Sequence, residues 1–366
     1  MLRSPIEIAG DRALSAVGAV PPNPCVGCVI FDKNSALLGQ GHTQAAGGPH
    51  AEVMALRDAA ARGHSVAGAT AYVTLEPCCH HGRTPPCCDA LIAAGIKKVV
   101  VSIEDPNPLV AGRGIARLRA AGIEVEVGPG AAESRELNIG FFSRMVRGVP
   151  WVRMKIAASL DGATALLNGQ SQWITGEAAR ADGHAWRARS SAVLTGIGTL
   201  LADRPRLDVR LVAAPRQPDL VIIDSRLETP LDAPVFIADR VRYIYAAERN
   251  DAKKDALEAR GATVIHMPGP DNKVDLAAML QDLGKREINE LHLEAGHKLN
   301  GSFIRERLVD ELLVYLAPRL FGTAQGMASF GPLQSLSQAI DLQFLSADMM
   351  GADLRVRARV TGRDQF

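Results

Sequence analysis

Four cysteines and two histidines crowd into the segment EPCCHHGRTPPCCDA, residues 76–90. Thiolate and imidazole groups are the usual protein ligands of Zn²⁺. All six cysteines of the 366-residue chain fall in its first quarter. A disulfide framework is typical of small secreted domains, so clustered cysteines in a chain of this length indicate a metal or catalytic site instead.

A second segment upstream, GGPHAEVMAL, places His50 and Glu52 in the first turn of an expected helix. Together the two segments read H-x-E followed by P-C-x8-C, with the cysteines at Cys78 and Cys87. The signature H-x-E…P-C-x-x-C is typical of zinc-dependent deaminases, and only the spacing between the cysteines differs here. The joint pattern is far more specific than either half alone.

These residue types suit hydrolytic deamination. Zinc held by three protein ligands keeps a fourth position for water and lowers the pKa of that water to about 7. A carboxylate near the metal, but not bonded to it, is needed to carry the proton from water to the ring nitrogen and the leaving amine. We therefore predict His50, Cys78 and Cys87 as zinc ligands and Glu52 as the catalytic proton carrier.

The other cysteines have different interpretations. Cys79 and Cys88 each adjoin a predicted ligand and cannot easily point at the same metal, so we predict that they are not ligands. Cys25 and Cys28 have the spacing of a zinc knuckle, but their place in an apolar strand favours packing. Two rival hypotheses remain: a deaminase with one activity and a ligand-binding second half, and a structural zinc protein in which the glutamate is dispensable.

Length, charge and hydropathy indicate which classes of protein this chain can belong to. A length of 366 residues predicts two domains. Lys+Arg 41 against Asp+Glu 40 argues against a nucleic-acid or anionic membrane surface. We find no apolar run of about eighteen residues, the length that predicts a transmembrane helix. The first residues carry Glu7 and Asp11 within their apolar stretch, unlike a secretory signal, so a cytoplasmic location is expected.

Short apolar strands alternate with helical stretches throughout, which predicts an α/β protein. In the first half we expect strands at 25–32, 70–76, 97–104 and 124–128, and helices at 52–62, 86–94 and 114–121. Thr84 and the two prolines after it are a good helix opening. The pattern restarts after Gly148 and Pro150, which predicts domains at 1–147 and 148–366.

The second half repeats the alternation. We expect strands near 151–158, 192–195, 219–224, 235–238, 242–245, 263–266, 290–294 and 312–316, and helices near 176–189, 276–283 and 301–307. No GxGxxG follows a strand, so a Rossmann dinucleotide site has no support. The segment EAGHKLNGS lies between a strand and a helix, where backbone N–H groups can face a phosphate.

Longer motifs carry a family resemblance over nearly the whole chain. They are PPNPCVGCVIFD, HAEVMAL and TLEPCCHHGRTPPCCDALIAAGIKK in the first half, and KIAASLDGATALLNGQSQWITG, LTGIGTLLADRPRLDVR and LHLEAGHKLNGSF in the second. The sequence resembles the bifunctional deaminase–reductase of riboflavin biosynthesis. The resemblance implies a cytidine-deaminase-like three-layer domain followed by a dihydrofolate-reductase-like domain, with Zn²⁺ and NADPH as cofactors. It also implies a homodimer formed through the reductase domain.

The implied reactions act on one nucleotide. The first would hydrolyse the 2-amino group of 2,5-diamino-6-(5-phosphoribosylamino)pyrimidin-4(3H)-one, giving 5-amino-6-(5-phosphoribosylamino)uracil. The second would reduce the ribosyl group to ribityl with NADPH. By the resemblance, substrate contacts fall at Asn23, the loop from His80 to Thr84, Lys155, Ser171, Arg187, Leu207, Arg210 and Glu294. Cofactor contacts fall at Ala157, Trp173, Thr199, Asp203, Gly296, Lys298, Asn300, Gly301 and Ser302.

Four positions depart from the family pattern. Cys79 stands where serine is common, and His297 and Lys298 stand where a proline and a small or polar residue are usual. Lys298 has two interpretations, a ligand of the NADPH 2′-phosphate or a solvated surface charge. Asp208 replaces a threonine or asparagine beside a phosphate-binding arginine, which is unfavourable unless its carboxylate points away from the phosphate.

Overall fold

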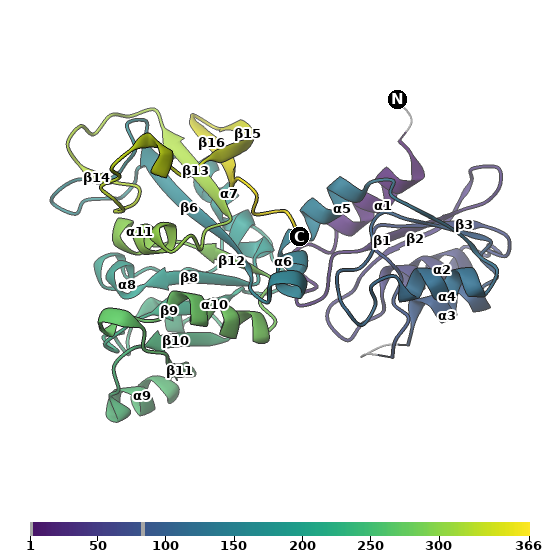
Figure 1. Cartoon of the computed structure of the whole chain (residues 1–366), viewed down its shortest axis with the longest axis horizontal. Coiled ribbons are helices and arrows are strands. Elements are labelled where there is room, and N and C mark those ends of the chain that lie inside the picture. The colour runs from purple at the N-terminus through teal and green to yellow at the C-terminus, as the bar shows by residue number, and fades with distance from the viewer. Residues whose placement is uncertain (1–2, 82–84) are drawn as a thin grey trace. The chain divides into compact units, whose positions relative to one another are not determined.

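The computed structural model describes residues 3–81 and 85–366, which divide into two compact units, Met1–Arg147 and Gly148–Phe366 (Figure 1). We refer to them as unit 1 and unit 2. The expected helix opening at Thr84 lies outside the described residues. No helix in the described ranges is long and apolar enough to cross a membrane.

Unit 1 is built on a five-stranded sheet with strand order β2-β1-β3-β4-β5. Its strands are β1 (Gly27–Phe31), β2 (Leu37–His42), β3 (Thr70–Val73), β4 (Lys98–Val101) and β5 (Glu124–Val127). β1 pairs antiparallel with both β2 and β3, and β3, β4 and β5 are parallel. Every residue of β1 is buried, as expected for a strand covered on both faces.

The described part of unit 1 also contains the helices α1 (Pro5–Leu14), α2 (Ala51–Ala61), α3 (Cys87–Ala93), α4 (Arg113–Ala120), α5 (Ala131–Leu137) and α6 (Ile139–Arg147). α1 and α5 lie on one face of the sheet, and α2, α3 and α4 lie on the other (Figure 1). Glycines allow this close packing, because a Cβ at Gly27 would collide with the backbone of α1 and one at Gly41 would lie 2.6 Å from Ala55 N in α2. The expected three-layer fold is confirmed.

Unit 2 is built on a nine-stranded sheet with order β11-β10-β9-β8-β12-β6-β13-β16-β15. Its strands are β6 (Trp151–Ser159), β8 (Ala192–Gly196), β9 (Asp219–Ile223), β10 (Arg242–Ala246), β11 (Thr263–His266), β12 (Glu290–Leu293), β13 (Glu311–Ala317), β15 (Leu342–Met350) and β16 (Asp353–Val360). The strands from β11 to β13 are parallel, and the β15–β16 hairpin adds to β13 in antiparallel fashion. β7 (Ala163–Ala165) and β14 (Gln325–Gly326) form a separate ribbon.

The helices of unit 2 are α7 (Glu177–Arg189), α8 (Ile197–Asp203), α9 (Asp251–Glu258), α10 (Leu276–Lys285) and α11 (His297–Arg305). Three short 3₁₀ turns cover Pro234–Phe236, Pro270–Asn272 and Leu336–Gln338. The central strands β6, β8 and β12 bury their apolar side chains against α10 and α11, including Met154, Leu194, Leu291, Met279 and Phe303.

The structure corrects two expectations in unit 2. The strand expected at 235–238 is wrong, since Pro234–Phe236 forms a 3₁₀ turn. Pro234 fixes its own φ and lacks an N–H, which favours the start of a turn. The helix expected from 301 begins at His297 instead, so most of the EAGHKLNGS segment is helical rather than a loop.

Candidate active sites

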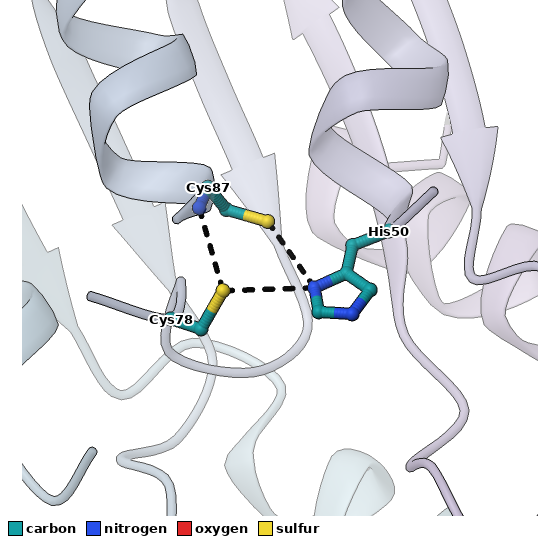
Figure 2. A group of neighbouring side chains, drawn as sticks. All are labelled: His50, Cys78 and Cys87. Atoms are coloured by element: carbon teal, nitrogen blue, oxygen red, sulfur yellow. Dashed lines mark hydrogen bonds between the residues drawn. The ribbon is translucent and has the colours of Figure 1, made fainter. Parts of the chain in front are cut away.

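The predicted metal ligands of unit 1 come together from three separate segments (Figure 2). His50 is the N-cap of α2, Cys87 is the first residue of α3, and Cys78 lies in the connection after β3. His50 Nδ1 lies 3.6 Å from Cys78 Sγ and 3.3 Å from Cys87 Sγ. The backbone N–H of Cys87 donates to Cys78 Sγ at 3.3 Å, which favours a thiolate at Cys78.

These distances fit zinc. In a tetrahedral site, with sulfur about 2.3 Å and nitrogen about 2.05 Å from the metal, the two ligand atoms lie about 3.5 Å apart. All three ligand atoms lie within 4.8 Å of one another. A hydrogen bond from the Cys87 thiol, with help from His50, lowers the pKa of Cys78 to about 4 despite its burial. One thiolate is therefore already favoured before a metal binds.

Glu52 lies two residues after His50, in the first turn of α2, and only 3% of its surface is exposed. Burial, followed by the charge of Cys78, raises the pKa of its carboxyl group to about 7. This carboxyl group interacts with the thiol of Cys87, one of the predicted zinc ligands. A carboxyl group beside the ligand cluster with a pKa near neutrality has the properties that a proton carrier needs.

The other cysteines point elsewhere. Cys88 is fully buried, and its thiol donates to the carbonyl oxygens of Pro77 at 3.2 Å and Gly114 at 3.5 Å. Cys28 is buried in β1 and lies outside the metal-ligand cluster, as does the half-buried Cys25. His80 is half-buried, and its Nδ1 has no hydrogen-bond partner among the described residues. Of the rest of its predicted substrate loop, His81 is exposed, and residues 82–84 lie outside the described residues.

One residue of this site was not predicted from the sequence. Glu76 is 3% exposed and has no cationic partner in the described part of unit 1. Its carboxylate accepts the backbone N–H groups of Asp105 (3.1 Å), Gly112 (2.9 Å) and Ile115 (3.0 Å). These bonds fix the chain two residues before Cys78. The sequence offered one signal of this role, an acidic residue immediately before Pro77. It did not reveal the hydrogen-bond partners of that residue, because they follow β4 in the chain.

The contrast between neighbouring cysteines gives a direct test of the ligand set. We expect Cys78→Ser to lose stoichiometric zinc, because a serine hydroxyl is a poor substitute for a thiolate. We expect Cys79→Ser, the matched control one residue away, to keep it. Metal content of the purified variants, measured by inductively coupled plasma mass spectrometry, checks both. Equal zinc loss in the two variants would mean that the ligand has been assigned to the wrong cysteine.

Unit 2 contains a cavity of about 1140 Å³. It opens where the parallel strands β8, β9 and β12 end, the usual position of ligand sites in open α/β sheets. Its walls include all but one of the residues predicted for this half, namely Lys155, Ala157, Ser171, Trp173, Arg187, Thr199, Asp203, Leu207, Arg210, Glu294, Gly296, Lys298, Asn300 and Ser302. Gly301 is the exception, since it packs against the backbone of Ser329.

The cavity suits a dinucleotide. Gly296 is the N-cap of α11, and no side chain caps the first N–H groups of that helix. A helix start without a side-chain cap, opening on a cavity, can receive a phosphate group. Ser171 and Asp203, predicted for substrate and cofactor respectively, both line this cavity. Lys298 is exposed on the cavity wall in the first turn of α11.

Three charged side chains meet on the cavity floor. Glu294 accepts two hydrogen bonds from the Arg187 guanidinium, one of them at 2.9 Å from Nη2, and lies 3.7 Å from Lys155 Nζ. Burial opposes ionisation of Glu294, but Arg187 and Lys155 hold its pKa well below the usual value. Glu294 therefore stays ionised and fixes both cations in place.

Several cavity residues were not predicted from the sequence. Ser225 and Arg226 line the cavity just after β9, Arg206 lines it between α8 and β9, and Lys273 lines it shortly before α10. Surface arginines and lysines carry no distinctive spacing, so only the fold shows that they face the same space. Asp208, in contrast, does not line the cavity, and its carboxylate pairs with Arg206 and Arg210.

Both units match known families. The cytidine and deoxycytidylate deaminase zinc-binding region matches residues 6–103, and the RibD C-terminal domain matches residues 150–356. The chain is 44% identical to riboflavin biosynthesis protein RibD of Escherichia coli, covering 91% of this chain and 92% of that protein. It is 39% identical to RibD of Aquifex aeolicus, covering 95% and 96%.

Solved structures agree over the full length. RibD of Acinetobacter baumannii superposes with a TM-score of 0.88 at 41% identity, covering 98% of each chain. A Thermotoga maritima diaminohydroxyphosphoribosylaminopyrimidine deaminase/5-amino-6-(5-phosphoribosylamino)uracil reductase superposes with a TM-score of 0.86 at 31% identity, covering 97% of each chain.

Fold, metal-ligand cluster and family matches together define a zinc-dependent deaminase joined to a reductase. The deaminase half carries the zinc-binding region of its family. The chain belongs to the RibD family of bifunctional enzymes of riboflavin biosynthesis. The resemblance found in the sequence is thus confirmed, and both rival hypotheses, a single-activity deaminase and a structural zinc protein, are set aside.

Proposed function

We propose that residues 1–147 deaminate 2,5-diamino-6-(5-phosphoribosylamino)pyrimidin-4(3H)-one, and that residues 148–366 reduce the product, 5-amino-6-(5-phosphoribosylamino)uracil. The observation that supports the first step is the His50, Cys78 and Cys87 cluster with buried Glu52 beside it. The cavity in unit 2, with its charged floor and open helix start, supports the second. The T. maritima relative, described as a deaminase and reductase for these compounds, supports the choice of substrate.

In unit 1, His50, Cys78 and Cys87 would hold Zn²⁺, which supplies the Lewis acidity that makes water nucleophilic at neutral pH. Glu52 takes a proton from the attacking water and delivers it to the ring nitrogen. It then takes the second proton from the hydroxyl group now bonded to the ring carbon and delivers it to the amine, which leaves as ammonia. Its pKa of about 7, set mainly by burial, allows both transfers near neutral pH. We assign Asn23 and His80 to substrate binding.

In unit 2, NADPH supplies the hydride that reduces the sugar. The open start of α11 at Gly296 receives a cofactor phosphate, with Lys298, Asn300 and Ser302 in the same two turns. The remaining cofactor contacts are Ala157, Trp173, Thr199 and Asp203. Lys155, Ser171 and Glu294 orient the ribosyl group, and Arg187, Leu207 and Arg210 hold its phosphate end.

Mass analysis of the diaminopyrimidinone ribotide after incubation with the zinc-loaded protein tests this function. In ¹⁸O-labelled water without NADPH, we expect one amino group to be exchanged for a labelled oxygen. With NADPH, the product should also gain two hydrogens. Deamination without reduction would contradict the assignment of unit 2, and no change in either tube would contradict the substrate.

We propose further that the enzyme is a homodimer through unit 2. β15 is an edge strand of the nine-stranded sheet, and it exposes Leu342 (43%), Phe344 (75%) and Met349 (62%). Edge strands with exposed apolar side chains are typical sites of association. Sedimentation velocity over a concentration series should show a dimer that Phe344→Lys converts to monomer, whereas Leu320→Lys, at another exposed apolar position, should not. Identical sedimentation of both variants would contradict this interface.

We also propose a cytoplasmic location. The metal cluster needs two cysteine thiols, and no disulfide joins any of the six cysteines, all of which lie within the described residues. Thiols stay reduced in the cytoplasm. Cell fractionation with an antibody against the chain tests this, and its recovery in an oxidising compartment would contradict it.

A further inference from the structure

The segment Arg206–Arg210 on the cavity wall of unit 2 belongs to no helix or strand, yet side chains hold its backbone in place. The guanidinium group of Arg240, 9% exposed, donates to the carbonyl oxygens of Arg206 and Leu207, both at 2.7 Å. The Gln217 side chain accepts the N–H of Val209 at 2.7 Å and donates to its carbonyl oxygen at 2.9 Å. The segment is therefore rigid without secondary structure.

Two further side chains complete this support. Arg187 Nη1 donates to the carbonyl oxygen of Asp208 at 3.0 Å, and His184 Nδ1 accepts the backbone N–H of Arg210 at 3.1 Å. Because that N–H can only donate, Nδ1 accepts it with a lone pair, and the other ring nitrogen, Nε2, lies 3.4 Å from Arg187 Nη1. Burial, and then the charges of Arg187 and Arg210, lower the pKa of His184 to about 4, so the ring stays neutral at neutral pH.

Asp208 organises the two arginines that the segment presents. Its side chain is 4% exposed, and its two carboxylate oxygens bind different partners: Arg210 Nη1 at 2.6 Å and Arg206 Nη2 at 2.6 Å. The arginine side chains are 42% and 46% exposed and line the cavity, whereas Asp208 does not. Burial raises the pKa of Asp208, but the two ion pairs more than offset this and keep it ionised.

The geometry points to Arg206 as a second ligand of the substrate phosphate beside Arg210, with Asp208 as the positioning residue that holds both guanidinium groups. This inference rests on the proposed function of unit 2. A guanidinium group has five N–H donors, so an ion pair with Asp208 leaves donors for a phosphate on each arginine. The segment carries two cationic side chains, Arg206 and Arg210, and one anionic side chain, Asp208. Its net charge is therefore positive, which favours the binding of a dianionic phosphate.

The two possible roles of Asp208 predict opposite results. If its charge only repelled the phosphate, Asp208→Asn would lower KM for the ribotide. If it positions the arginines, the same change leaves both arginine side chains free to move. Binding of the substrate must then order them, which costs conformational entropy, so KM rises. We expect a rise of about 10-fold for Asp208→Asn and of about 10- to 100-fold for Arg206→Gln, the range for a lost hydrogen bond between charged groups.

The experiment compares NADPH-dependent reduction of 5-amino-6-(5-phosphoribosylamino)uracil with that of its dephosphorylated riboside. In the wild type the ribotide should have the lower KM. Arg206→Gln and Asp208→Asn should remove most of this advantage and leave the KM for the riboside unchanged, which a general structural defect would not do. Arg249→Gln, an exposed arginine away from the cavity, is the matched control.

The outcomes separate the inference from the function it rests on. A wild-type enzyme that prefers the ribotide, together with variants that keep that preference, would overturn the role of Arg206 and Asp208 while leaving the proposed function intact. A lower KM for the ribotide in Asp208→Asn would overturn the positioning role alone. Failure of the wild type to reduce either compound would overturn the proposed function and this inference with it.

Discussion

Glu52→Gln should lower kcat for deamination by about 10²- to 10⁴-fold, the usual contribution of a positioned general acid–base group. Glutamine has the same size but cannot accept and release a proton, so the loss reports the chemistry rather than the packing. NADPH-dependent reduction of the aminouracil ribotide should be unchanged, because that cavity lies wholly in unit 2. Both rates are measured on the same preparation, one with each substrate.

Two controls make the result specific. The zinc content of Glu52→Gln should equal that of the wild type, since the carboxyl group lies outside the cluster of His50, Cys78 and Cys87. Glu133→Gln, at an exposed position in the first turn of α5, should leave deamination unchanged. Deamination at a tenth of the wild-type rate or more, with full zinc content, would rule out Glu52 as the proton carrier.

The zinc cluster was predictable because its signal is local. His50 and Glu52 stand two residues apart at a helix start, and Pro77 precedes Cys78. Each segment therefore indicates its chemistry without knowledge of the fold. Only the pairing of the two segments in space depends on the fold, and the sheet provides it by bringing the starts of α2 and α3 together.

The support for the Arg206–Arg210 segment was not predictable in the same way. Arg240 and His184 hold its backbone from 26 to 34 residues away along the chain, and neither has a motif around it. From the sequence, Asp208 beside a phosphate site is unfavourable. The structure resolves this, because the carboxylate turns to the two arginines instead of the cavity. Such partnerships depend on tertiary contacts that no local pattern specifies.

The burial of charged side chains in the sheet of unit 2 was not predictable either, because it depends on strand order and register. Arginines at alternate positions of β16 suggest a solvent-facing strand, and the β15–β16 hairpin was missing from the expected elements. In the structure, Arg357 and Arg359 lie beside buried Glu311 in β13. The register of β6 against β13 also sets Glu311 opposite Arg153. These charges can be called buried only after the strand order is known.

Arg153→Met should therefore destabilise unit 2 by about 3–5 kcal/mol, the range for removing one partner of a buried ion pair. Arg153 is 1% exposed, and it binds Glu290 at 2.7 Å and Glu311 at 3.0 Å. Methionine fills much of the space but leaves both carboxylates with fewer cations. All three tryptophans of the chain lie in unit 2, so urea unfolding followed by tryptophan fluorescence reports this unit alone.

The same variant should also become more sensitive to acid. Burial raises the pKa of Glu290 and Glu311, but the surrounding arginines outweigh it and bring both values to about 2. Since an unfolded glutamate titrates near about 4.3, these carboxylates stabilise the fold above that pH, and their contribution is lost as pH falls toward 2. With Arg153 removed, both pKa values rise, so acid unfolding should begin at a higher pH.

A matched surface change separates burial from charge. Lys254 and Glu258 form an exposed pair at 3.9 Å on α9, so Lys254→Met should change stability by no more than about 0.5 kcal/mol and leave the acid transition in place. A loss below about 1 kcal/mol in Arg153→Met would show that Arg189, Arg357 and Arg359 neutralise the two glutamates without it. A large loss with an unmoved acid transition would assign the effect to packing against Trp186, whose ring centre lies 4.5 Å from the Arg153 guanidinium. Only the two changes together establish Arg153 as the central cation of this buried cluster.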